Sequence, residues 1–134
     1  MQDRYGHRIS YLRVSITDRC NERCSYCMPQ ELQEWLPRHE ILTYEETLRL
    51  IRIATELGVS KVRITGGEPL TRRGILDFVR QIPAIPGITS IGLSTNGTLL
   101  ARQIAADATM AKALCHAGVQ SVNISLDTLD AAVY

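Results

Sequence analysis

Residues 43–65, TYEETLRLIRIATELGVSKVRIT, contain a helix and a strand in succession, and they decide the fold class. Thr43 and Glu46 have the spacing of a capping box, in which each side chain satisfies a free backbone amide at a helix start. Apolar residues at helical spacing then predict a helix that runs to Gly58, a natural left-handed stop. From Lys61 onward apolar and polar residues alternate, which predicts a strand. This stretch is therefore a helix–strand unit of an α/β protein.

The spacing of apolar residues alternates between helical and strand patterns on both sides of this unit. Alternating residues predict three further strands, at 11–17, 90–94 and 122–127. Helical spacing predicts two further helices, at 73–81 and in the alanine-rich stretch 99–117. Because strands that alternate with helices join through crossover connections, this order predicts a parallel sheet.

The four predicted strands carry a small or polar residue at every second position, whereas sheets covered on both faces have continuous apolar strands. One face is therefore expected under helices, and the other faces either a ligand-filled lumen or solvent. A complete (β/α)₈ barrel takes ~250 residues, about twice this length. We expect a partial parallel (β/α) barrel, truncated after about four strands, that is the N-terminal part of a larger protein. Its inward side chains would be those of Arg13, Ser15, Arg63, Thr65, Ser94, Asn123, Ser125 and Asp127.

Composition excludes several classes of protein. The chain has 134 residues, 45% of them hydrophobic, with 15 Lys and Arg against 14 Asp and Glu. This balance argues against a nucleic-acid clamp and against a polybasic membrane anchor. No stretch approaches the ~18 apolar residues of a membrane span, and the N-terminus lacks the pattern of a signal peptide. A cytoplasmic, reducing location is therefore expected.

Three of the four cysteines, Cys20, Cys24 and Cys27, lie within eight residues directly after the first strand. They occupy a long connection, and long connections inside compact domains are usually functional. Their spacing is that of metal ligands, but three thiolates are one short of the four that close a zinc site or saturate a cubane cluster. An open coordination position is one reading. A zinc site completed by His39 or Cys115, or a group of redox-active or inert thiols, are the alternatives.

The run Cys20–Cys27, CxxxCxxC with the aromatic Tyr26 before its last cysteine, resembles the signature of radical S-adenosylmethionine (SAM) enzymes. The wider string LRVSITDRCN at 12–21 resembles, within that superfamily, the GTP 3′,8-cyclases of molybdenum cofactor biosynthesis. The resemblance implies that Cys20, Cys24 and Cys27 hold a [4Fe–4S] cluster whose unique iron is chelated by SAM. It also places Tyr26 among the cofactor-binding residues.

Other strand ends carry the same resemblance. The turn TGGEP at 65–69 is similar to the family's GGEP motif, so Gly67 would contact SAM through its backbone, and Ser125 matches a second cofactor contact. Arg13, Arg63 and Ser94 match GTP-binding positions, although position 94 is commonly threonine in the family. Without the resemblance, the glycines are an ordinary turn, and the two strand arginines are surface residues or structural partners of nearby carboxylates. The pair Arg72–Arg73 begins a predicted helix and is expected to be solvated.

The resemblance implies a lyase that cleaves SAM to a 5′-deoxyadenosyl radical and converts GTP to 3′,8-cyclo-7,8-dihydro-GTP. It implies a low-potential electron donor and a possible homodimer in the full-length family. We assign no catalytic residue in this stretch. It covers residues 11–130 but only the first half of the family, so residues 1–134 would be the N-terminal part of a radical SAM core domain. The C-terminal half and the second cluster domain would be missing, and the chain alone would be incomplete for turnover. A radical SAM enzyme with another substrate, or a non-catalytic zinc-binding remnant, are the alternatives.

Overall fold

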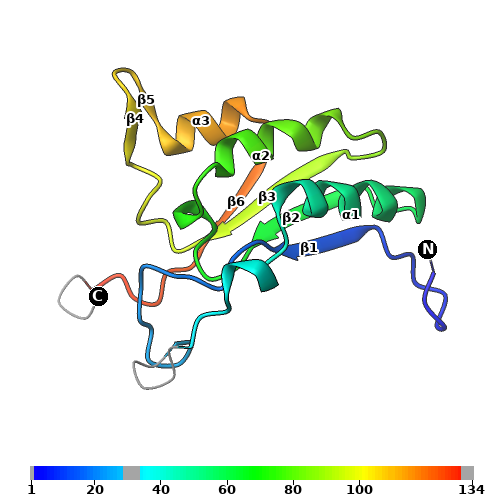
Figure 1. Ribbon diagram of the computed structural model, residues 1–134, viewed down its shortest axis with the longest axis horizontal. Helices are drawn as coiled ribbons and strands as arrows, with labels where there is room; N and C mark the ends of the chain where they lie inside the picture. Colours follow the sequence, from blue (N-terminus) through cyan, green and yellow to red (C-terminus); the bar gives the residue numbers. More distant parts are fainter. Residues whose placement is uncertain (1, 29–33, 131–134) are drawn as a thin grey trace.

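A computed structural model describes residues 2–28 and 34–130, and its centre is a four-stranded parallel sheet (Figure 1). The strands are β1 (Tyr11–Ser15), β2 (Lys61–Thr65), β3 (Ser90–Thr95) and β6 (Ser121–Ile124), in the spatial order β1-β2-β3-β6. Both the α/β class and the parallel sheet are therefore confirmed.

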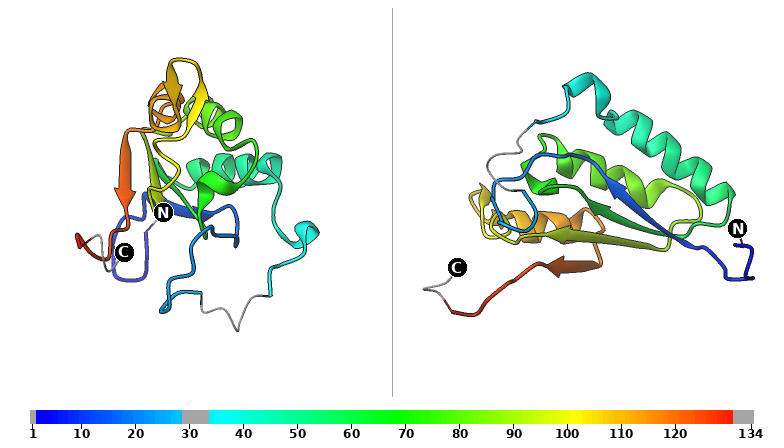
Figure 2. Two further views of the ribbon diagram at one scale, coloured as in Figure 1. Left: turned by 90° about the vertical axis from the view of Figure 1, so that its left-hand side faces the viewer. Right: turned by 90° about the horizontal axis from the view of Figure 1, so that it is seen from below.

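Three helices cover one face of this sheet, as Figures 1 and 2 show: α1 (Tyr44–Glu56), α2 (Ile75–Gln81) and α3 (Met110–His116). The alternating apolar residues of the strands point toward them, so Ile64 and Leu93 are fully buried in the core beside Phe78 of α2. Polar residues of the same strands lie on the opposite face, which no helix of the described chain covers. We call this the open face.

Helix α1 forms as its sequence predicts. The Thr43 backbone N–H donates to Glu46 Oε2 at 2.7 Å, and the Glu46 N–H donates to Thr43 Oγ1 at 3.1 Å, which completes the capping box. Leu48 and Ile51 are buried in the core. None of the helices in the described chain combines the length and the apolar character that a membrane crossing requires.

The second helix begins two residues later than predicted. Gly74 precedes α2 with φ 81°, a left-handed conformation that interrupts the helix, so Arg72 and Arg73 lie before the helix. At its other end α2 continues into a single 3₁₀ turn, Ile82–Ala84, which contains Pro83. Arg72 is also not solvated as expected, because it is half-buried and donates to two backbone carbonyls.

The predicted long helix at 99–117 is wrong in its first half. Residues 103–105 and 108–109 instead form a small antiparallel hairpin, β4 (Gln103–Ala105) and β5 (Ala108–Thr109). Helix α3 begins only at Met110, because the Thr109 hydroxyl accepts a hydrogen bond from the Lys112 N–H and caps it. The local cap therefore outweighs the alanine-rich composition.

The fourth sheet strand is shorter and more exposed than expected. It ends at Ile124 rather than at 127, and the side chains of Val122 and Ile124 are 41% and 56% exposed. Both line an apolar groove of about 150 Å³ beside Leu114 of α3. They are exposed because no helix of the described residues packs over β6, which is an edge of the sheet.

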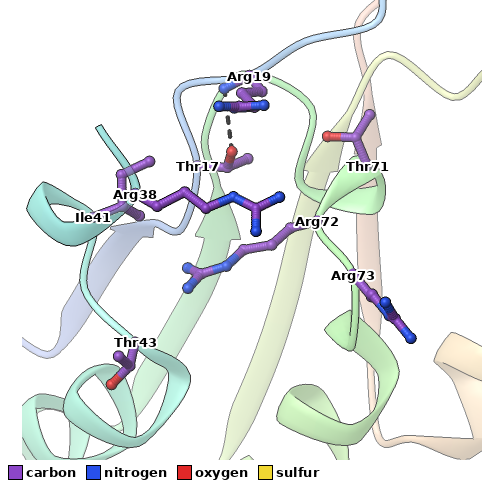
Figure 3. A pocket seen from close by; sticks show the side chains of 8 residues that line it. All are labelled: Thr17, Arg19, Arg38, Ile41, Thr43, Thr71, Arg72 and Arg73. Carbon is purple, nitrogen blue, oxygen red and sulfur yellow. Dashed lines mark hydrogen bonds between the residues drawn. The ribbon is translucent and has the colours of Figure 1, made fainter. Parts of the chain in front are cut away.

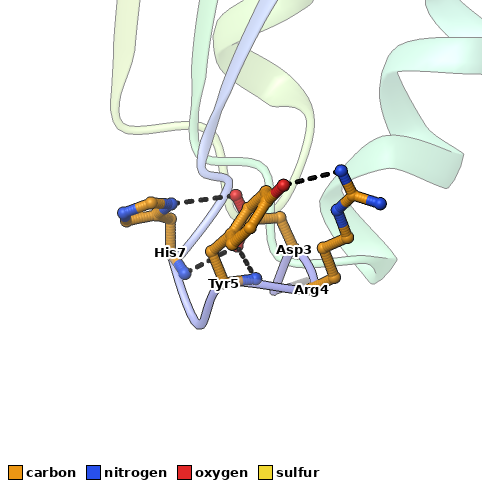
Figure 4. A network of polar contacts seen from close by, with 4 residues as sticks. All are labelled: Asp3, Arg4, Tyr5 and His7. Carbon is orange, nitrogen blue, oxygen red and sulfur yellow. Dashed lines mark hydrogen bonds and ion pairs between the residues drawn. The ribbon is translucent and has the colours of Figure 1, made fainter.

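The N-terminal segment forms a tight turn ahead of β1 (Figure 4). The Asp3 carboxylate accepts from the backbone N–H groups of Tyr5 and His7, and it contacts His7 Nδ1 at 2.9 Å. The hydrogen bond from the His7 ring holds the pKa of Asp3 below its usual value. This turn lies at the amino end of the strands, away from the cysteines.

Candidate cofactor and substrate site

The cysteine loop leaves the sheet at the carboxyl end of β1. Cys20 and Cys24 are half-buried, whereas Cys27 is exposed. A tight turn brings the N–H groups of Cys27 and Met28 onto the Cys24 carbonyl oxygen, at 2.9 and 3.0 Å. The Glu22 N–H points to Cys20 Sγ at 3.4 Å, a contact that suits a thiolate.

The donor chemistry of this loop fits an iron–sulfur cluster, because thiolates are the ligands such clusters take. The described residues do not hold the sulfur atoms ready around one point: no group of three or more Cys, His, Asp or Glu among them could bind a metal ion. The zinc alternative also finds no assembled site there. Cys115 lies on α3, and His39 lies beside Glu40, with 3.9 Å between Nε2 and Oε1.

The Gly66–Gly67 turn after β2 packs directly against the chain that leads to Cys20. The Gly67 N–H donates to the Thr17 carbonyl oxygen, and the Glu68 N–H to that of Arg19, both at 2.8 Å. A Cβ at position 66 or 67 would lie 2.4 Å from a backbone oxygen of this segment. Glycine is therefore required here by a close approach of the protein's own backbone.

Glu68, the acidic residue of this turn, is fully buried. Its carboxylate accepts from the Thr95 hydroxyl at 2.9 Å, from the Asn96 N–H at 2.7 Å and from the Leu70 N–H at 3.0 Å. The glycine turn is thereby fixed to the carboxyl end of β3. The sequence analysis did not identify this role of Glu68. The available signal is a carboxylate placed between two glycines and the apolar pair Pro69–Leu70.

Asn96 continues the connection back to the cysteine loop. Its side-chain amide donates to Asn21 Oδ1 at 3.0 Å and approaches Cys20 Sγ at 3.9 Å. The Asn21 amide in turn donates to Thr98 Oγ1 at 2.8 Å. Residues that follow three different strands are thus joined by one hydrogen-bond network, which sequence analysis did not find.

Tyr26 joins the cysteine loop to the segment after β6. Its hydroxyl donates to the Asp127 carboxylate, 2.9 Å from each oxygen, across 101 positions of sequence. This bond stabilises the neutral phenol and raises the pKa of Tyr26 to about 12. The ring is 72% exposed, so its contact is at the rim of the site.

On the open face, Arg13 of β1 lies directly opposite Arg63 of β2 in the strand register. The Arg63 guanidinium lies across the sheet and donates to Tyr11 Oη, to the Leu93 carbonyl oxygen and to Ser121 Oγ. All three acceptors are neutral, and no carboxylate of the described chain forms an ion pair with either arginine. The alternative, in which Asp18 or Asp127 holds these arginines, is not met among the described residues, because those carboxylates accept from Leu36 N–H and from Tyr26 Oη.

The two serines lie at the carboxyl ends of the strands. Ser94 is half-buried in β3, in register with Asn123 of β6. Ser125 directly follows β6, and its N–H donates to the Thr95 carbonyl oxygen at 3.0 Å. The structure thus brings the cysteine loop, the glycine turn, the two arginines and the two serines together along one edge and one face of the sheet.

A profile of the radical SAM superfamily matches residues 14–134. The chain belongs to the radical SAM superfamily. Among its relatives, a GTP 3′,8-cyclase of Thermodesulfovibrio yellowstonii is 51% identical over 131 residues, covering 97% of this chain and 38% of that protein. A GTP 3′,8-cyclase of Pelotomaculum thermopropionicum is 53% identical over the whole chain, covering 39% of that protein.

The fold also agrees with this superfamily. A crystal structure of BtrN in complex with AdoMet and 2-DOIA superposes with a TM-score of 0.63 at 17% identity, covering 92% of this chain and 46% of that one. Membership in the radical SAM superfamily implies a [4Fe–4S] cluster and SAM as cofactors. This radical SAM chain spans about two fifths of the length of the curated relatives it matches.

Proposed function

We propose that this chain is the N-terminal part of the radical SAM core domain of a GTP 3′,8-cyclase of molybdenum cofactor biosynthesis, a lyase. The strongest support is the 51–53% identity to proteins of that name over 97–100% of the chain. The motifs at the strand ends of this chain support the same function, because the cysteine loop, the glycine turn and Asn96 form one hydrogen-bonded unit.

Cys20, Cys24 and Cys27 would hold the [4Fe–4S] cluster. Three thiolates leave one iron of the cluster without a protein ligand. SAM needs such an iron for chelation. When bound, the cluster supplies the electron that cleaves SAM to methionine and a 5′-deoxyadenosyl radical. The N–H groups of Glu22 and Asn96 point toward Cys20 Sγ and would stabilise its thiolate.

Gly67, Tyr26 and Ser125 would bind SAM. The Gly67 N–H is already bonded to Thr17, whereas no described residue donates to the Gly67 carbonyl oxygen, which is thus available to the amino group of SAM. Tyr26 is held at the rim by Asp127. Ser125 is exposed, so its hydroxyl is accessible to the cofactor.

Arg13, Arg63 and Ser94 would bind GTP on the open face. These two adjacent arginines have no carboxylate partner among residues 2–28 and 34–130, so they attract an anion, and guanidinium groups suit phosphate oxygens or a purine edge. The GTP C3′ hydrogen would be abstracted there and C3′ joined to C8 of guanine. These residues would position the nucleotide, while the radical chemistry belongs to the cofactor.

A low-potential electron donor would reduce the cluster, and a homodimer would form in the full-length protein. With 15 basic against 14 acidic residues, neither nucleic acid nor a membrane is a proposed partner. The proposed location is the cytoplasm.

The test is anaerobic reconstitution of the chain with iron and sulfide, followed by metal analysis and a visible spectrum. We expect about four irons per chain and broad absorption near ~400 nm. The variant Cys24→Ser should lose the cluster, while the matched control Cys115→Ser should retain it. Colourless protein with stoichiometric zinc would overturn the proposal in favour of a zinc-binding remnant.

Turnover provides the second arm of this test. With SAM, GTP and dithionite, the reconstituted chain should yield little cyclic product, since about three fifths of the relatives' length lies outside it. Appreciable 3′,8-cyclo-7,8-dihydro-GTP from this chain would show that it suffices for the reaction.

A further inference from the structure

A cavity of about 430 Å³ lies beside the start of α1, on the side of the sheet that the helices cover. Its lining is strongly basic, and none of the described residues that line it carries a carboxylate. The residues that line it are Thr17, Arg19, Arg38, Ile41, Thr43, Thr71, Arg72 and Arg73.

Three of the four guanidinium groups converge on this cavity (Figure 3). Those of Arg38 and Arg72 extend toward each other from opposite walls, and that of Arg19 lies at the top, whereas Arg73 points away. They come from three separate segments: the cysteine loop, the 3₁₀ turn Arg38–Glu40, and the connection before α2.

Of these three guanidinium groups, only that of Arg72 has partners within the part of the chain that the structure describes. Arg72 donates to the carbonyl oxygens of Ile16 and Leu42, and its guanidinium lies 4.1 Å from the centre of the Tyr44 ring. Within residues 2–28 and 34–130, the side chains of Arg19 and Arg38 form neither a hydrogen bond nor an ion pair.

No counter-ion for these three charges is found among the described residues. Like charges that converge repel one another, and a bound anion would reduce that repulsion. Guanidinium forks match the oxygen atoms of phosphate, which can accept from several of them at once. The nearly buried Thr17 adds a hydroxyl at the cavity wall.

We propose that this arginine cavity binds a phosphate-type oxyanion, either free or as the phosphoryl group of a larger molecule. It is a separate site from the proposed GTP site, because Arg13 and Arg63 lie on the open face, whereas this cavity adjoins α1 on the covered side. Arg19 is the neighbour of Cys20 in sequence. A bound anion would therefore link the start of the cysteine loop to Arg38 and to Arg72.

The test is isothermal titration calorimetry of the chain with inorganic phosphate, with pyrophosphate and with AMP. Arg38→Gln and Arg19→Gln should each weaken binding of the preferred anion at least tenfold. Arg49→Gln, an exposed change on α1, is the matched control and should bind as the parent does. Far-UV circular dichroism verifies that each variant is folded.

The probes also distinguish the two sources of the anion. Tighter binding of inorganic phosphate or pyrophosphate than of AMP identifies a free oxyanion, and the reverse identifies a phosphoryl ester. The proposal is overturned if no probe binds, or if Arg38→Gln and Arg19→Gln bind as tightly as Arg49→Gln. Because no cluster, SAM or GTP takes part in this titration, the outcome is independent of the proposed cyclase function.

Discussion

The guanidinium of Arg63 lies over the backbone of Gly92, its register partner on the neighbouring strand. A Cβ at position 92 would lie 2.9 Å from Arg63 Cζ and Nη2. The missing side chain at 92 therefore gives the arginine its path across the open face, from Tyr11 Oη on β1 to Ser121 Oγ on β6. The guanidinium thereby lies flat on the sheet, and no carboxylate in the described ranges pairs with its charge.

Gly92→Ala tests whether this placement matters for nucleotide binding. Because the atoms that the new methyl group meets belong to the end of a flexible side chain, unfolding free energy should fall by only about 1 kcal/mol. The displaced guanidinium should nevertheless weaken GTP binding severalfold, measured by equilibrium dialysis. Equal affinity in Gly92→Ala and the parent would remove Arg63 from the proposed GTP site.

Gly67→Ala should destabilise the fold strongly. The added Cβ meets backbone atoms of Asp18 and Arg19 at 2.4–2.6 Å, and backbone cannot rotate away as a side chain can. We expect a loss of about 3 kcal/mol in urea denaturation, the upper range of overpacking. Gly6→Ala is the matched control: its φ is +85° with nothing within 4 Å, so only the conformational cost of roughly 1 kcal/mol applies. Equal losses in the two variants would contradict the proposed packing.

Removal of the Glu68 carboxylate should be equally costly, for a different reason. Glu68→Ala leaves the Thr95 hydroxyl and two backbone N–H groups buried without an acceptor, a loss of about 3–5 kcal/mol. Glu68→Gln keeps the shape and one acceptor oxygen, so about 1–2 kcal/mol is expected. The exposed Glu56→Ala on α1 should change stability by less than about 0.5 kcal/mol. A loss that small for Glu68→Ala would show that the buried network does not stabilise the fold.

The phenol of Tyr26 should titrate near pH 12, since its bond to Asp127 favours the protonated form. The hydrogen bond to Asp127 therefore contributes to stability. Because the pKa of Tyr26 is raised, that contribution is fully present below pH 10, the ordinary pKa of tyrosine, and is lost as pH rises toward 12. The difference between absorbance titrations at about 295 nm of the parent and of Tyr26→Phe isolates this group from Tyr44, whose pKa burial also raises to about 12. Asp127→Asn should move the Tyr26 midpoint back toward 10, and an unchanged midpoint would exclude the bond in solution.

Local sequence signals predict structure well where backbone hydrogen bonds are made to residues only a few positions away. Thr43 and Glu46 cap α1 as predicted, and the first three sheet strands lie within two residues of their expected bounds. At 99–117 the alanine-rich composition predicts a long helix, but the local cap at Thr109 starts the helix only at Met110.

Long-range partners were not predictable in the same way. The sequence predicts a solvated Arg72 at a helix start, but its acceptors, the carbonyls of Ile16 and Leu42, lie 56 and 30 positions away. Glu68 reaches Thr95 across 27 positions and Tyr26 reaches Asp127 across 101. No periodicity encodes such pairs, because they depend on how strands stack side by side.

By itself, the sequence determined the parallel α/β class, the three-cysteine loop and the family, because periodicity, caps and motif spacing are properties of neighbouring residues. Only the tertiary structure decided why two glycines stand at 66–67, where Arg63 lies, and that Arg19, Arg38 and Arg72 share one cavity. The physical reason is that the carboxyl ends of parallel strands bring together segments that lie far apart in the chain. Close backbone approach and uncompensated charge arise only once those segments meet.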